Sequence, residues 1–166
     1  CYGDNTSITV IASGGTAPYS GTGNFTAGAG TYNYSVTDAN GCTASVVTTV
    51  TQPSSPLSVS AVAGTINCYG GTTTVTVSAI GGTAPYAGTG NFTVGAGTYN
   101  YTVTDANGCA STVSITVNQP AATLVASATA GTIICNGGIT NVSVNASGGT
   151  APYSGTGSFS IGAGSY

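Results

Sequence analysis

Few side chains in this sequence could carry chemistry. The chain has no Lys, Arg or His, its acidic residues are Asp4, Asp38 and Asp105, and it contains five cysteines. General acid–base catalysis needs a titrating group held close to a reacting proton, usually from His, Glu, Asp or Lys. Three scattered aspartates supply too few such groups. We therefore expect that the protein is not an enzyme and that it uses no cofactor.

The cysteines recur at two fixed intervals. Cys1, Cys68 and Cys135 lie 67 residues apart, and Cys42 and Cys109 each follow the preceding member of that series by 41 residues. Two thiolates without a histidine or a second cysteine pair cannot complete a tetrahedral zinc site, so disulfides are favoured over a metal. We predict one disulfide per module, Cys1–Cys42 and Cys68–Cys109, with the partner of Cys135 beyond this sequence. Such bonds place the protein outside a reducing cytosol.

Two of the aspartates lie in the same motif. Val-Thr-Asp-Ala-Asn-Gly-Cys occurs at residues 36–42 and again at residues 103–109. An Asp side chain can bond the backbone ahead of it in a turn, while Asn and Gly tolerate positive φ. Calcium is the alternative, but it needs several clustered oxygen ligands. One Asp per turn favours a structural turn and predicts no metal.

The whole chain follows the interval set by the cysteines. Gly-Gly-Thr-Ala-Pro-Tyr begins at Gly14, Gly81 and Gly148, again 67 residues apart. This period exceeds the roughly 20–50 residues of a solenoid coil and suits one small domain per repeat. We predict a partial module at residues 1–53 that lacks its first strand, a complete module at 54–120, and a module at 121–166 truncated at its C-terminus.

The pattern within the complete module predicts β-strands. Leu57–Ala61, Thr74–Ala79, Tyr99–Val103 and Thr112–Val117 alternate apolar and polar residues, as half-buried strands do. Tyr86 and Phe92 are expected in two further short strands. Six or seven strands bounded by Gly and Pro predict an all-β fold of tandem, small, immunoglobulin-like antiparallel β-sandwiches.

The tyrosines of these strands allow two interpretations. Tyr32 and Tyr34, like Tyr99 and Tyr101, alternate along a strand. They could form a platform on which a sugar stacks. Their placement before the Asp turn favours packing in the core, with a hydroxyl reaching backbone as in a tyrosine corner.

Charge and hydropathy limit the partners. Net charge is −3 without a single cation, so nucleic acid is not expected to bind. No apolar run is long enough to span a bilayer, and no signal peptide opens the chain. A surface with so little charge needs another source of solubility, which glycans would supply. Alternatively, the neutral faces pack against other copies. Candidate acceptors in the N-x-[ST] pattern are Asn24, Asn33, Asn91, Asn100, Asn141 and Asn145.

Four motifs in fixed order resemble a known family. Cys-Tyr-Gly, Gly-Gly-Thr-Ala-Pro-Tyr, Ala-Gly-Thr-Tyr-Asn-Tyr and Val-Thr-Asp-Ala-Asn-Gly-Cys are similar to SprB-type repeats of Bacteroidota cell-surface adhesins, and the resemblance covers essentially the whole chain. It implies an immunoglobulin-like or PKD-like sandwich, export by type IX secretion, and a place in a long array at the cell surface.

Three functions fit these observations. The array could be a spacer that extends an adhesive tip, or its modules could assemble into an extracellular fibre. The absence of charged edge residues permits strand addition between copies. The third possibility is weak, multivalent binding of a surface polysaccharide. We expect a non-enzymatic stalk or fibre subunit, with neighbouring repeats and other copies as its partners.

Overall fold

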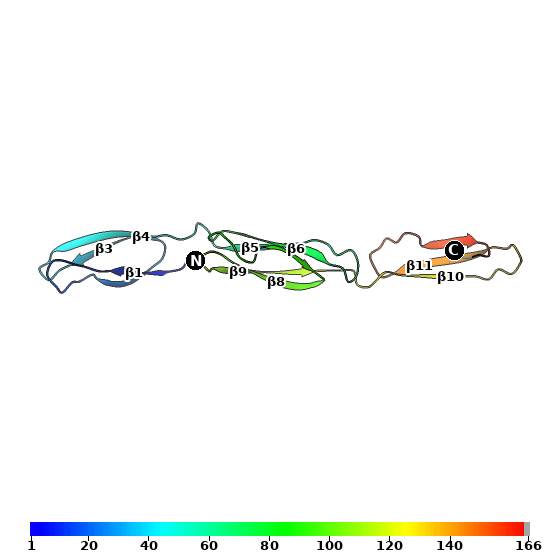
Figure 1. The fold of residues 1–166 in the computed structure, drawn as a ribbon, viewed down its shortest axis with the longest axis horizontal. Coiled ribbons are helices and arrows are strands. Elements are labelled where there is room, and N and C mark those ends of the chain that lie inside the picture. Colours follow the sequence, from blue (N-terminus) through cyan, green and yellow to red (C-terminus); the bar gives the residue numbers. More distant parts are fainter. Residues whose placement is uncertain (165–166) are drawn as a thin grey trace. The chain divides into compact units, whose positions relative to one another are not determined.

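The computed structural model describes residues 1–164 and contains β-strands with no helix in that range (Figure 1). Strand pairing is antiparallel between β1 and β2, β3 and β4, β6 and β7, β10 and β11, and β11 and β12. Over those residues there is accordingly no helix of the length and hydropathy that a membrane span requires. The strands are β1 (Thr6–Val10), β2 (Gly23–Ala27), β3 (Gly30–Thr37), β4 (Thr43–Val50), β5 (Ser58–Ala63), β6 (Thr73–Ile80), β7 (Gly90–Val94), β8 (Gly97–Thr104), β9 (Ala110–Val117), β10 (Val125–Ala130), β11 (Thr140–Ser147) and β12 (Gly157–Ile161).

The chain forms two compact units whose limits differ from the repeat boundaries. Unit 1 comprises Cys1–Ser60, Ser78–Thr89 and Thr102–Thr112. Unit 2 comprises Ala61–Val77, Gly90–Tyr101 and Val113–Tyr166. We keep the terms first, second and third repeat for residues 1–53, 54–120 and 121–166. Unit 1 thus contains the connection between the first and second repeats, and unit 2 contains the connection between the second and third.

The second repeat holds a complete set of five strands. Its strands form one sheet in the order β5-β6-β7 and a second sheet of β8 and β9. The sequence predicts all five of these strands, including the short strand around Phe92 that is β7, and the inward positions Tyr99, Tyr101 and Val103 alternate with exposed ones as expected. Tyr86 lies outside any strand, which corrects the prediction of a sixth. Its neighbour Ala87 forms only an isolated bridge with Thr104, because Gly88, at φ +92°, turns the chain away.

The first and third repeats contain subsets of these strands. In the first, β1 pairs with β2 and β3 pairs with β4, so no strand occupies the position that β5 holds beside β6. In the third, the sheet β10-β11-β12 corresponds to β5-β6-β7. The described residues contain no counterpart of β8 and β9 in this repeat. Each of these two repeats therefore leaves uncovered a surface that the second repeat buries.

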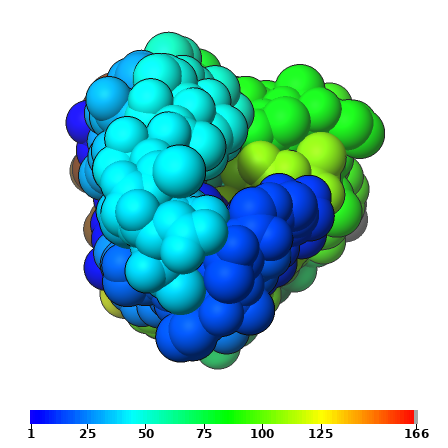
Figure 2. Space-filling model, turned by 90° about the vertical axis from the view of Figure 1, so that its left-hand side faces the viewer, coloured from blue at the N-terminus to red at the C-terminus, as the bar shows by residue number. Residues whose placement is uncertain are grey.

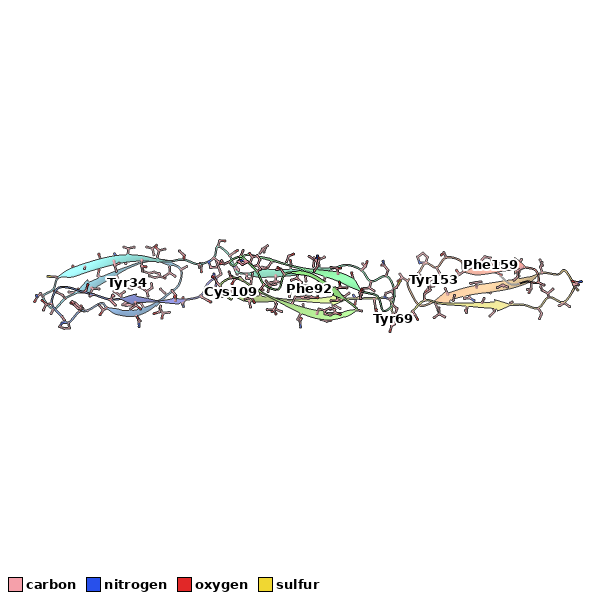
Figure 3. The ribbon with its side chains drawn as sticks, in the orientation of Figure 1. Tyr34, Tyr69, Phe92, Cys109, Tyr153 and Phe159 are labelled. Atoms are coloured by element: carbon pink, nitrogen blue, oxygen red, sulfur yellow. A yellow bond between two sulfur atoms is a disulfide. The ribbon has the colours of Figure 1, made fainter. Side chains whose placement is uncertain are left out.

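The core of the first and of the second repeat lies between the two sheets of that repeat. Val75 on β6 and Val103 on β8 are fully buried. Phe92 on β7 packs against Tyr101 with ring centroids 4.8 Å apart, and Phe25 packs against Tyr34 in the same way at 4.7 Å. Tyr34 and Phe92 are labelled among the side chains of Figure 3. Aromatic pairs at this separation add to the stability gained from burial alone.

Candidate functional site: the junction between repeats

The feature with the clearest chemistry is a disulfide between two repeats. Cys1, ahead of β1, is bonded to Cys109, ahead of β9, across 108 residues of sequence, with the Cα atoms 5.5 Å apart. Both cysteines belong to unit 1. The bond therefore crosses the linker at residues 51–57 and joins the first repeat covalently to the second.

This pairing corrects the predicted bonds Cys1–Cys42 and Cys68–Cys109. Three antiparallel strands separate Cys68 from Cys109, so the two cysteines lie at opposite ends of their repeat. An eight-residue strand such as β8 spans about 26 Å, whereas a disulfide requires Cα atoms within about 7 Å. Cys42, Cys68 and Cys135 are free and exposed.

The turn that carries Cys109 is held by Asp105. Its Oδ1 accepts hydrogen bonds from the N–H groups of Asn107 and Cys109, both at 2.9 Å, and its Oδ2 accepts one from Thr83 N at 2.9 Å. Asn107 Nδ2 donates to Thr83 Oγ1 at 2.9 Å and so fixes the turn to the Gly81–Gly82 turn. Asp38 makes the same bonds to Thr16, Asn40 and Cys42.

These hydrogen bonds explain why the pKa of each of the two carboxylates is lowered. For Asp38, the N–H groups of Thr16 and Cys42 lower its pKa. For Asp105, burial raises the pKa, but the three backbone N–H groups outweigh burial and the pKa is lowered overall. Both carboxylates are thus charged turn-forming groups with their oxygens already engaged. Within residues 1–164 no group of three or more potential metal-ligating side chains occurs.

Two further contacts hold the junction, one made by the side chain of Gln52 and one between the backbone groups of Gly82 and Ser55. Gln52 Oε1 accepts a hydrogen bond from Gly3 N at 2.9 Å, and Gln119 Oε1 accepts the corresponding bond from Gly70 N at 2.8 Å. Each glutamine thus holds the loop that carries Cys1 or Cys68 beside the C-terminal end of the same repeat. Gly82 N then donates to Ser55 O at 2.9 Å, which seats the linker on the second repeat.

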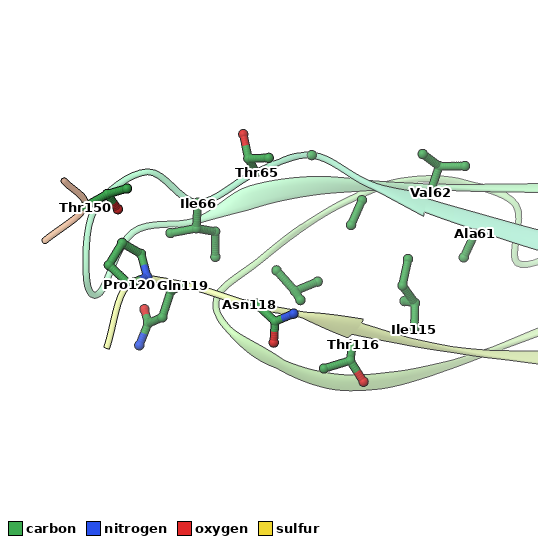
Figure 4. Close-up of a pocket in the computed structure, with 13 residues that line it drawn as sticks. Ala61, Val62, Thr65, Ile66, Ile115, Thr116, Asn118, Gln119, Pro120 and Thr150 are labelled. Carbon is green, nitrogen blue, oxygen red and sulfur yellow. The ribbon is translucent and has the colours of Figure 1, made fainter. Parts of the chain in front are cut away.

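The junction in unit 2 has an open groove where unit 1 has its disulfide (Figure 4). The groove is lined by the end of β5, by Ile66 near Cys68, by Gln119 and Pro120 at the end of the second repeat, and by Thr150. Thr150 corresponds to Thr83, which contacts Asp105 in the second repeat.

The tyrosines are placed mainly for stability. Tyr32 Oη donates to Gly28 O at 3.1 Å and Tyr99 Oη donates to Gly95 O at 3.2 Å, as the core interpretation predicts. Tyr101 differs, because its Oη is buried without a partner. Tyr19, Tyr86 and Tyr153 each donate to the first glycine of their own Gly-Gly turn, across a cis Ala-Pro bond. This arrangement disfavours a sugar platform built from the strand tyrosines.

The six candidate glycosylation residues are all exposed, and all lie on strands. Asn24 Oδ1 accepts a hydrogen bond from Thr9 Oγ1 at 2.7 Å, and Asn91 accepts the same bond from Thr76 at 2.9 Å. Threonine hydroxyls also pair across strands, as Thr98 and Thr116 do at 3.0 Å. The outward faces are thus ordered rows of hydroxyl and amide groups, and glycosylation at Asn33, Asn100, Asn141 and Asn145 stays a prediction like that at Asn24 and Asn91.

Comparison with known proteins adds no relative to this description. No model of a known protein family matches the chain, and no curated protein matches it either.

One signal in the sequence could have identified the correct disulfide. An odd number of antiparallel strands between two cysteines places them at opposite ends of a domain, and an even number returns the chain to the same end. Three predicted strand segments would have to be counted correctly between Cys68 and Cys109. At the junction, the side-chain oxygen of Gln52 and the backbone carbonyl of Ser55 both accept from backbone N–H groups of glycines, and residue types do not reveal those partners.

Proposed function

We propose that this chain is a structural repeat segment of a secreted cell-surface protein, with immunoglobulin-like modules that form an extracellular stalk or fibre. The observation that carries the proposal is the Cys1–Cys109 bond, which joins consecutive repeats rather than closing one of them. A disulfide is stable in an oxidising, extracellular environment. A bond across a linker transmits tension from one repeat to the next even when the linker itself is pulled.

Two further features support a mechanical role. The Gln52 and Gln119 contacts repeat at equivalent positions, so the same junction chemistry recurs along the chain. The residues best suited to chemistry, Asp38 and Asp105, are used to hold turns. Resemblance to SprB-type repeats supports the same conclusion and adds the expectation of export by type IX secretion.

Single-molecule force extension tests the proposal. With handles at residues 1 and 166, the oxidised chain is expected to hide the segment between Cys1 and Cys109 from extension. Reduction should release about 36–39 nm of additional contour length, from 108 residues at 3.3–3.6 Å each. A C42S variant, which removes a free thiol at the equivalent turn, is the matched control and should extend like the unaltered chain. Equal extension before and after reduction would contradict a load-bearing junction.

A further inference from the structure

The Asp turns of the first and second repeats each contain an Asn-Gly pair. Asn40 precedes Gly41, and Asn107 precedes Gly108. In such a pair the backbone nitrogen of the glycine can attack the side-chain amide carbon of the asparagine, because glycine has no side chain to hinder the approach. The five-membered ring that forms then opens with water to aspartate or isoaspartate. The pair is therefore a reactive position in a chain that has few reactive side chains.

The closed turn of the second repeat holds both reacting groups in hydrogen bonds. Asn107 Nδ2 donates to Thr83 Oγ1 at 2.9 Å. Gly108 N donates to Asp105 O at 3.0 Å. Attack requires the amide carbon of Asn107 to rotate toward Gly108 N, and it requires that nitrogen to lose its proton. Both hydrogen bonds must break before the ring can form, so the closed turn slows the reaction.

The turn of the first repeat holds its Asn-Gly pair in the same way. Asn40 Nδ2 donates to Thr16 Oγ1 at 2.9 Å, and Gly41 N donates to Asp38 O at 3.1 Å. Figure 2 looks onto this end of the first repeat, where the cyan segment around residues 38–42 lies at the surface beside the blue segment around residues 13–17. Asn40 and Asn107 are both exposed, so water can reach them. Hydrogen bonding rather than burial therefore limits the reaction.

Conversion of Asn107 would place a second carboxylate beside Asp105. Both side chains already contact Thr83, because Asp105 Oδ2 accepts from Thr83 N and Asn107 Nδ2 donates to Thr83 Oγ1. Two carboxylates that share a site repel each other. The chain has no Lys, Arg or His side chain that could neutralise the added charge. Isoaspartate also adds one carbon atom to the main chain of the turn. A converted turn is therefore expected not to close in its original form.

We propose that Asn40 and Asn107 are modification sites that the closed turns protect, and that each is converted to aspartate or isoaspartate when its turn opens. Gly108 N bonds to Cγ of Asn107 as the bond from Cγ to Nδ2 breaks, and the proton lost by the glycine nitrogen leaves with that group as ammonia. Water then cleaves one of the two ring C–N bonds and yields a carboxylate and a proton, with no change of oxidation state. The added charge opposes closure, so a turn that has opened is marked permanently.

The protection is tested by incubating the full chain at mildly alkaline pH, folded and in guanidinium chloride. Mass spectra of peptic peptides report the mass gained when the amide –NH2 is replaced by –OH. Conversion of Asn107 should be about 25-fold slower in the folded chain, from two hydrogen bonds that each contribute about fivefold. Asn136 also precedes a glycine but lies outside an Asp turn, so it should convert sooner than Asn107 in the folded chain. Equal rates at Asn107 in the two states would overturn the proposal.

A pair of matched variants tests the hydrogen bonds themselves. Thr83→Ala removes the acceptor of Asn107 Nδ2 and should raise the rate at Asn107 about fivefold in the folded chain, with Asn40 unchanged. Thr16→Ala should do the reverse. Thr83→Ser keeps the hydroxyl group and should keep the slow rate, which separates the lost hydrogen bond from a general loosening of the repeat. Equal acceleration of both sites by Thr83→Ala would contradict protection by the individual turn.

Hydrogen exchange gives a measurement on the unaltered chain that needs no variant. Because both exchange and conversion proceed from the open turn, the protection of Gly108 N–H against exchange should match the ratio of the unfolded to the folded conversion rate. A Gly108 N–H that exchanges freely while Asn107 stays unconverted would show that the assigned hydrogen bonds do not provide the protection.

The effect of the added charge is tested with Asn107→Asp. This variant should lower the midpoint of urea-induced unfolding at pH 7, and the loss should shrink below about pH 4, where carboxylates take up protons. Ser114→Asp adds the same charge at an exposed position of β9 and should change the midpoint little. An Asn107→Asp chain as stable at pH 7 as the unaltered one would contradict the permanent mark. None of these measurements depends on the proposed stalk or fibre function, which the force experiment tests separately.

Discussion

The first and second repeats have closely similar sequences and different interiors. Val103 is fully buried, whereas Val36 at the same position of the first repeat is only half-buried. Asp105 is buried and Asp38 is half-buried, although both make the same three hydrogen bonds to backbone. The difference follows from β5 and its flanking residues, which cover the second repeat and have no counterpart in the first. Burial in this protein is therefore set by the strand that arrives from the linker as much as by the repeat itself.

The largest effect in this comparison should come from the cysteines. A C1S/C109S chain should lose about 4–5 kcal/mol of unfolding free energy in the chain-entropy account, because the closed loop spans 108 residues. C42S, at the same turn of the first repeat, should change the stability little. Urea-induced unfolding under oxidising conditions measures both. Equal midpoints for the two variants would mean that the junction bond does not stabilise the fold.

Truncation of Val103, compared with truncation of its counterpart Val36 in the first repeat, should give the next largest effect. Val103→Ala removes two methyl groups from a fully buried position and should cost about 2 kcal/mol, from the lost burial and the cavity left behind. Val36→Ala should cost about half as much, because water already reaches that side chain. Thermal unfolding followed by circular dichroism provides the measurement. The role assigned to the β5 strand fails if the two substitutions prove equally costly.

Two glycines at equivalent positions, Gly81 and Gly14, provide a further test of the difference between the second and first repeats. Gly81 and Gly14 both have positive φ, at +74° and +79°, so alanine is strained at either position by about 1 kcal/mol. Only at Gly81 does the added methyl group also meet the carbonyl of Pro56. Gly81→Ala should therefore lower the melting temperature more than Gly14→Ala, by scanning calorimetry. A larger loss for Gly14→Ala would show that the first turn is covered in solution.

The smallest effect concerns pH. Because the folded-state pKa of both Asp105 and Asp38 is lowered, each carboxylate contributes stability above its ordinary pKa of about 4. This contribution is lost as the pH falls through the folded pKa. Stability should thus be level near neutral pH and decline below about pH 4. Asp105→Asn and Asp38→Asn should each flatten the decline, and equilibrium unfolding between pH 2 and pH 7 tests this.

The sequence was informative about local structure and misleading about connectivity. Alternation along Thr74–Ala79 and Thr112–Val117 predicts β6 and β9 because one face of each strand is buried. The Asp105 turn follows from local side-chain bonding and was also predicted. The partner of Cys109 was not, since a fixed interval between cysteines fits a bond within a repeat as well as one between repeats. Only the direction of the intervening strands distinguishes the two, and the predicted extra strand at Tyr86 obscured it.

The length of the Cys1–Cys109 loop has a consequence for cleavage by proteases. A single cut at any peptide bond between these cysteines, including the exposed linker around Ser54, leaves the two fragments joined through sulfur. Enzymes that cleave after Lys or Arg find no such residue in the chain. A chain nicked between Cys1 and Cys109 would therefore keep its continuity until the disulfide itself is reduced, so two independent kinds of damage are needed to sever this segment.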